Sequence, residues 1–192
     1  MDLYFKAEKG GLDLEYWNGN YQHFLETQKG VISSQNGINV WGVNILYAYP
    51  ISINEDVTIE EIQIALSSSV AGNSVIGLYD NLNGLPNNLI FQSSAFDNSV
   101  TGAQTDILPS PIFIKKGLYF VAYNTSSSPN IYIFDSYNVI NVFGASFSNL
   151  RANPNIRLTA GYTYTGTLPT TFGSPVQSTN GIYVPAVLFK IS

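Results

Sequence analysis

The chain has 192 residues, enough for one domain with a substantial core, and only 11% of them are charged, against about 25% in ordinary soluble proteins. Its formal net charge is −5 and its eight Lys and Arg residues are scattered, which excludes the basic patch that nucleic-acid binding needs. It has no Cys and no run of 18 apolar residues, so we expect no disulfide, no Cys-ligated zinc and no membrane insertion.

The N-terminal segment differs in charge from the rest of the chain. Of the eight basic and thirteen acidic residues, eight lie between Asp2 and Lys29. The stretch that follows, QKGVISSQNG at 28–37, has the composition of a linker. We therefore predict an arm of residues 1–36 that docks on another protein, followed by a sandwich domain of residues 37–192. An ordinary first hairpin is the alternative.

Short apolar runs typical of β-strands alternate with turn residues from residue 38 onward. The run LYFVAY at 118–123 is apolar on both faces, which predicts a central strand. No helical period of useful length appears outside a short stretch near Asp13 to Phe24. About ten such runs, with turn signals every 8 to 12 residues, predict an all-β fold: an antiparallel, jelly-roll-like β-sandwich.

One of these runs, VTIEEIQIAL at 57–66, changes its alternation in the middle. Val57 and Ile59 share one parity, whereas Ile62, Ile64 and Leu66 share the other. A β-bulge at the two glutamates between them would place all five apolar side chains on one face. We therefore expect the paired acids to point toward solvent.

The stretch DNLNGLP at 80–86 has the composition of a turn or of a calcium loop. An EF-hand loop with Gly84 at position 6 would have Tyr79 at position 1 and Ile90 at position 12, which excludes that motif. A looser oxygen cage around Asp80 remains open. We predict a corner between strands, in which Gly84 supplies a permissive backbone and Pro86 fixes the exit.

The polar segment at 159–181 is too long for a hairpin turn, and loops of this length tend to be functional or to pack on a partner. Tyr162, Tyr164 and Phe172 lie in it and are our candidates for contact with a ligand or another subunit, because aromatic rings suit both sugars and proteins. The alternative is that these rings hold the loop on its own sandwich or on a neighbouring subunit.

Several of these segments together resemble a known family. VTIEEIQIALSSSVAGNSVIGLYDNLNGLP at 57–86, followed by KKGLYFVAY, GTLPTTFG and a closing apolar strand, resembles a β-sandwich module of bacteriophage tail fibres and related virion surface proteins. The resemblance covers about residues 40–192. It implies a non-enzymatic fibre, spike or decoration on the particle surface, which assembles as a homotrimer and recognises host glycan or protein. The separately charged arm of residues 1–36 would then join it to other virion proteins. Purely structural scaffolding of the capsid or tail is the alternative.

A polysaccharide depolymerase is a third hypothesis. Glycoside cleavage needs two carboxylates in one cleft, and Asp80, Asp97, Asp106 and Asp135 all lie near predicted loops. No motif links these acids, and the single His23 lacks a partner at a suggestive spacing. We therefore assign no catalytic residue, no metal site and no cofactor.

Overall fold

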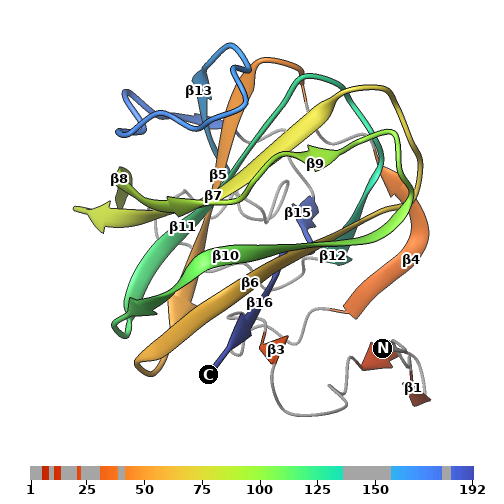
Figure 1. Ribbon diagram of the computed structural model, residues 1–192, viewed down its shortest axis with the longest axis horizontal. Coiled ribbons are helices and arrows are strands. Elements are labelled where there is room, and N and C mark those ends of the chain that lie inside the picture. The colour runs from red at the N-terminus through yellow and green to blue at the C-terminus, as the bar shows by residue number, and fades with distance from the viewer. Residues whose placement is uncertain are drawn as a thin grey trace, which may run out of the picture.

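The protein folds into two antiparallel β-sheets that face each other around a common core (Figure 1), and this confirms the predicted all-β sandwich. The computed structural model describes residues 6–8, 11–13, 21–22, 31–38, 42–135, 157–178 and 183–192. We name the two sheets after their central strands, the β6 sheet and the β11 sheet. Among the sixteen strands in the described residues, ten have four residues or more, which agrees with the predicted number.

Within the described residues, each sheet has seven strands. The β6 sheet contains β3 (Tyr21–Gln22), β4 (Val31–Ile38), β6 (Val57–Leu66), β10 (Gly102–Ile114), β12 (Ile131–Asp135), β15 (Tyr183–Pro185) and β16 (Leu188–Ile191). The β11 sheet contains β5 (Ile45–Ile53), β7 (Asn73–Leu82), β8 (Leu85–Gln92), β9 (Phe96–Asp97), β11 (Gly117–Thr125), β13 (Arg157–Gly161) and β14 (Val176–Ser178). A separate hairpin joins β1 (Lys6–Glu8) to β2 (Gly11–Asp13).

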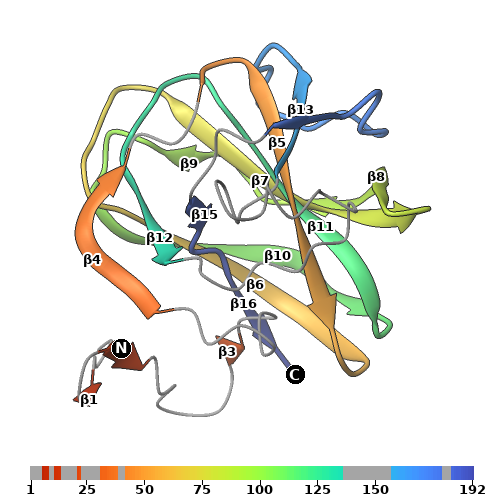
Figure 2. The same cartoon turned by 180° about the vertical axis from the view of Figure 1, so that it is seen from behind.

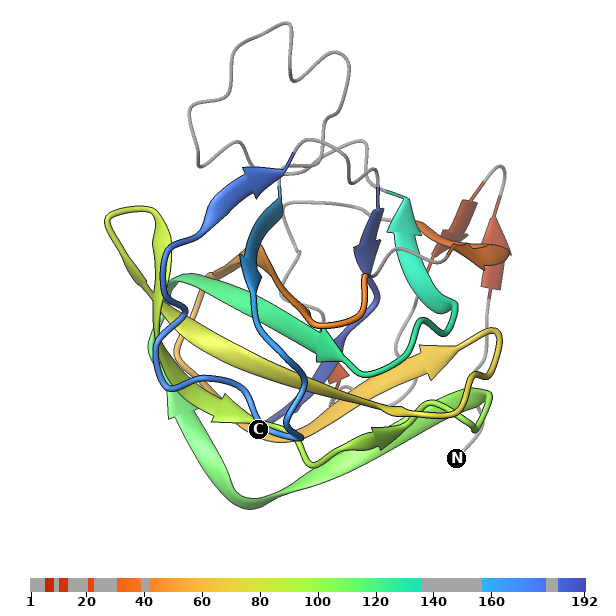
Figure 3. The ribbon, with the colours of Figure 1, turned by 90° about the horizontal axis from the view of Figure 1, so that it is seen from above.

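The chain passes repeatedly from one sheet to the other. The strands β5, β7, β11 and β13 belong to the β11 sheet, and β6, β10, β12 and β16, which come between or after them in the sequence, belong to the β6 sheet. Seen from above in Figure 3, these crossings wrap the chain around the core. This winding is the feature that makes the sandwich resemble a jelly roll.

The β-bulge predicted in β6 is present. Val57, Ile59, Ile62, Ile64 and Leu66 are all buried in the core between the sheets. On one side of β6 the pairing with β16 skips a residue at this point, and on the other side the pairing with β10 is also interrupted. The extra residue restores the inward alternation of the apolar side chains.

The strand β11 is central, as the sequence predicts, because it pairs with β5 on one side and β7 on the other. Its side chains alternate between two cores. Val121 and Tyr123 face the core between the sheets, whereas Phe120 and Ala122 belong to a second apolar cluster on the outer face of the same sheet. Both faces of the β11 sheet are therefore buried.

The turn between β7 and β8 has two residues, Asn83 and Gly84, both with positive φ (54° and 85°). Leu82 pairs with Leu85 across it. Two positive φ angles are typical of the tight hairpin turn that Asn-Gly sequences favour. The corner predicted from the sequence is confirmed.

The predicted linker at 28–37 is wrong from residue 31 onward, because β4 (Val31–Ile38) pairs with β12 inside the β6 sheet (Figure 2). The proposed boundary between residues 36 and 37 thus falls within a strand of the sandwich. A paired neighbour strand can hold Ser, Asn and Gly in a strand, which local composition cannot reveal. Docking by residues 1–36 stays a prediction. Within the described residues, no helix has the length and hydropathy to span a membrane.

Candidate recognition surface

The outer face of the β11 sheet is covered by residues 162–175, which we call the strap. The strap connects β13 to β14 and lies beside β7 and β8, in blue in Figures 1 and 3. It contains no charged residue. It is the central part of the long loop that the sequence identified as a candidate site.

Asn44 holds the first end of the strap. Its backbone oxygen accepts a hydrogen bond from the Tyr162 amide (3.2 Å), and its side-chain oxygen accepts one from the Tyr164 amide (2.9 Å). Asn44 has a φ of 61°, in the left-handed region that Asn tolerates better than most residues. The Asn124 side chain, fully buried, donates to the Tyr162 carbonyl (3.1 Å). The strap therefore starts from fixed backbone positions.

Leu168 fixes the middle of the strap on a row of small residues. Ala48, Ala122 and Gly77 are neighbours across β5, β11 and β7, and Leu168 packs on the outer face at this row. A Cβ at Gly77 would lie 2.6 Å from Leu168 Cδ1 and 2.7 Å from a backbone oxygen of Phe91. The glycine is required here because the strap and β8 both approach its Cα.

Tyr79 supplies a second anchor from β7. Its hydroxyl donates a 2.6 Å hydrogen bond to the carbonyl of Pro169, and its ring meets Phe172 edge-on, with centroids 5.4 Å apart. Burial raises the pKa of the Tyr79 hydroxyl far above its usual range, and nearby Tyr162 adds to the effect. Tyr79 therefore stays a neutral donor to Pro169 at every ordinary pH.

The far end of the strap pairs with the edge of β8. The Leu89 amide donates to the Thr170 carbonyl (2.9 Å), and the Phe172 amide donates to the Asn87 carbonyl (2.9 Å). These bonds occupy backbone groups that an edge strand would otherwise expose. The strap thus covers both the outer face and the outer edge of the β11 sheet.

The three predicted site residues have different environments. Phe172 is only 2% exposed and is part of the cluster under the strap, so its ring offers no surface to a ligand. Tyr162 and Tyr164 are half-buried and pack against the same cluster. All three rings therefore contact their own sandwich, which is the alternative that the sequence left open. A further contact of Tyr162 and Tyr164 with a ligand stays a prediction.

Hydroxyl groups predominate on the exposed side of the strap. Because side chains alternate along an extended segment, Thr163, Thr165 and Thr167 are exposed, while the residues between them are half-buried. The Thr165 hydroxyl lies 3.3 Å from both the Tyr162 and the Thr167 hydroxyls. The sequence analysis missed these threonines and the anchors Asn44 and Gly77. The alternation of Thr with Tyr was the available signal.

The acids considered for catalysis take part in local structure. Asp80 accepts hydrogen bonds from the backbone and side chain of Asn88 (2.6 and 3.3 Å), and Asp97 accepts two from Ser99 (2.8 and 2.6 Å). Asp106 accepts one from the Ser94 amide (3.0 Å). The described part of the chain contains no group of three or more His, Asp or Glu residues placed to hold a metal ion. The side chain of Asp135 and all of His23 lie outside the described residues.

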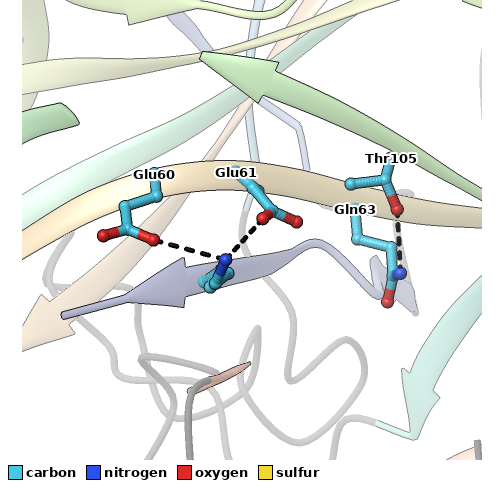
Figure 4. A network of polar contacts seen from close by, with 5 residues as sticks. Glu60, Glu61, Gln63 and Thr105 are labelled. Carbon is cyan, nitrogen blue, oxygen red and sulfur yellow. Dashed lines mark hydrogen bonds and ion pairs between the residues drawn. The ribbon is translucent and has the colours of Figure 1, made fainter. Parts of the chain in front are cut away.

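Charged side chains lie instead on the outer face of the β6 sheet. The β-bulge turns Glu60 and Glu61 to this face, and the Lys190 ammonium on β16 contacts both carboxylates, at 3.3 and 2.6 Å (Figure 4). These bonds raise the pKa of Lys190. Beside them, Gln63 donates to the Thr105 hydroxyl at 3.0 Å. The paired acids do not point freely into solvent as expected, because they are half-buried members of this ion-pair cluster.

Comparison with known proteins identifies no relative, since neither a family model nor a curated protein sequence matches the chain.

Proposed function

We propose that the protein is a non-enzymatic component of a phage virion surface, a fibre, spike or decoration, and that the strap is its contact with an uncharged glycan or protein. The observation that carries the recognition part of this proposal is the strap itself: an uncharged, hydroxyl-lined segment of 14 residues, 162–175, fixed at both ends and in the middle. A merely connecting loop would need only a few residues.

The anchoring supports a recognition role because an ordered surface loses little conformational entropy on binding. The exposed groups of the strap are hydroxyls and parts of tyrosine rings, which together can hydrogen-bond and stack on a sugar or a neutral protein surface. Since no charge lies in residues 158–178, a neutral partner fits this surface better than an anionic one.

The assignment to a virion rests on the resemblance to tail-fibre modules. The segments that carry it form the bulged β6, the Asn-Gly turn, the start of β11 and the strap. In line with that family, we propose a homotrimer. The distinct charge of the N-terminal segment supports its attachment to other virion proteins by residues 1–36. Light scattering at micromolar concentration tests the oligomer, and a stable monomer would contradict it.

The experiment for the strap is binding of the purified full chain to an array of neutral glycans. The double variant Thr163→Glu with Thr167→Glu adds charge to the exposed side without touching the cluster beneath, and should abolish a signal that wild type gives. The control is Thr101→Glu, which adds one charge at an exposed threonine outside the strap and should bind like wild type. Equal binding by all three proteins, or by none, would refute the recognition role.

Scaffolding without an external ligand is the second candidate, because the strap rings pack on their own sandwich. In that case the glutamate double variant would bind no less glycan than wild type but would fail to assemble. Release of reducing sugar from host polysaccharide would instead indicate a depolymerase.

A further inference from the structure

The turn between β7 and β8 contains a chemically reactive pair, Asn83 and Gly84. In an Asn-Gly pair, the glycine amide nitrogen can attack the asparagine side chain because glycine has no Cβ to obstruct the approach. Asn83 is exposed at the tip of the hairpin, so water and hydroxide reach it freely. The sequence has four Asn-Gly pairs, and this is the one whose side chains the structure describes.

One hydrogen bond controls the attacking atom. The Gly84 amide donates its proton to the Asn81 side-chain oxygen at 2.9 Å. Base must remove this proton before the nitrogen can react, and the bond to Asn81 both stabilises the N–H group and directs it away from Asn83. We propose that Asn83 is a deamidation site and that the Asn81 side chain slows the reaction there by holding the Gly84 amide proton.

The reaction needs only water. After losing its proton, the Gly84 nitrogen bonds to the side-chain carbonyl carbon of Asn83, the bond from that carbon to the side-chain nitrogen breaks, and ammonia leaves with the proton it requires. Water then opens the cyclic imide at either carbonyl, which leaves aspartate or isoaspartate at position 83. No group is oxidised or reduced.

The product changes the hairpin in two ways. It adds a negative charge three residues after Asp80 in the chain, and the isoaspartate form adds a methylene to the backbone of a two-residue turn that pairs Leu82 with Leu85. The next residues of β8 hold the far end of the strap through Asn87 and Leu89. Deamidation at the tip should therefore loosen the strap.

The test follows deamidation at each Asn-Gly pair by peptide mapping with mass spectrometry, using the full-length protein at mildly alkaline pH. We expect conversion at Asn83, slower than in a free peptide of residues 78–88. Asn81→Ala should accelerate it about fivefold, the factor that corresponds to one net hydrogen bond of about 1 kcal/mol. Asn81→Asp keeps an acceptor and should react no faster than wild type. Asn83→Gly, which has no amide to lose, is the blank.

Three results would overturn the proposal: no conversion at Asn83, conversion as fast as in the free peptide, or no acceleration by Asn81→Ala. A final measurement uses the added charge to separate the modified protein by ion exchange. Amide hydrogen exchange at Phe172 should be faster in the modified fraction. An unchanged rate there would show that the tip and the strap are not coupled.

Discussion

The outer faces of the two sheets are built in opposite ways. Under the strap, the β11 sheet presents buried apolar side chains such as Leu46, Phe120 and Tyr79. The β6 sheet instead presents Glu61, Lys190 and other polar side chains on its outer face. The strands reflect this difference: β11 is apolar on both faces, whereas β6 alternates. Continuous apolar strands thus require a third layer, and alternating strands do not.

Removing a large ring from each outer face gives the strongest test of this comparison. Phe172→Ala should destabilise the protein by about 3 to 5 kcal/mol, because the buried ring leaves a cavity beside Tyr79. The matched change on the β6 sheet is Phe113→Ala, whose ring is 59% exposed, and its effect should stay within about 0.5 kcal/mol. Denaturant unfolding measures both. Similar losses for the two variants would mean that the faces do not differ in burial.

The space beneath the strap can be tested with a single methyl group. Gly77→Ala should cost about 1 to 3 kcal/mol, because the new Cβ would collide with Leu168 and with the backbone oxygen of Phe91. Gly161→Ala is the control, since a Cβ there meets open space and the change should be neutral or slightly stabilising. Thermal unfolding measures both variants. If their melting temperatures are equal, Leu168 of the strap does not pack closely against Gly77 of β7.

Asn44, the first anchor of the strap, should contribute less to the free energy of unfolding than the packing of the strap on the sheet. Asn44→Ala should cost about 2 kcal/mol, from one lost hydrogen bond to Tyr164 and from a side chain held at positive φ. Asn44→Gly keeps the backbone free to adopt this φ and should cost about 1 kcal/mol. Urea midpoints distinguish the two variants. If Asn44→Gly is as unstable as Asn44→Ala, the positive φ at residue 44 does not contribute to the loss of stability.

The local pattern of apolar residues was enough to predict the inner core, but it did not predict the position of the strap. The bulge in β6 follows from the parity of Ile59 and Ile62, and the central place of β11 follows from its two apolar faces. The strap depends on contacts between distant residues: Asn44 and Tyr164 are 120 positions apart, and Tyr79 and Pro169 are 90 apart. Threonine, glycine and proline in a row predict a loop, and they carry no information on which sheet face the loop will cover.

The smallest expected effect is that of pH, because the anchors of the strap do not titrate in the ordinary range. Burial raises the pKa of Tyr79, and it raises that of Tyr123, on the inner face, to about 12. An unfolded tyrosine has a pKa of about 10, so the unfolded chain loses these protons first as the pH rises. The stability that the neutral tyrosines provide is therefore complete below about pH 10 and declines above it.

Tyr79→Phe keeps the ring but removes the bond to Pro169, so it should cost about 1 kcal/mol at neutral pH and weaken the decline above pH 10. Unfolding measured from pH 7 to pH 11 in both proteins would show this, and a wild-type decline that begins well below pH 9 would mean that another group controls the strap.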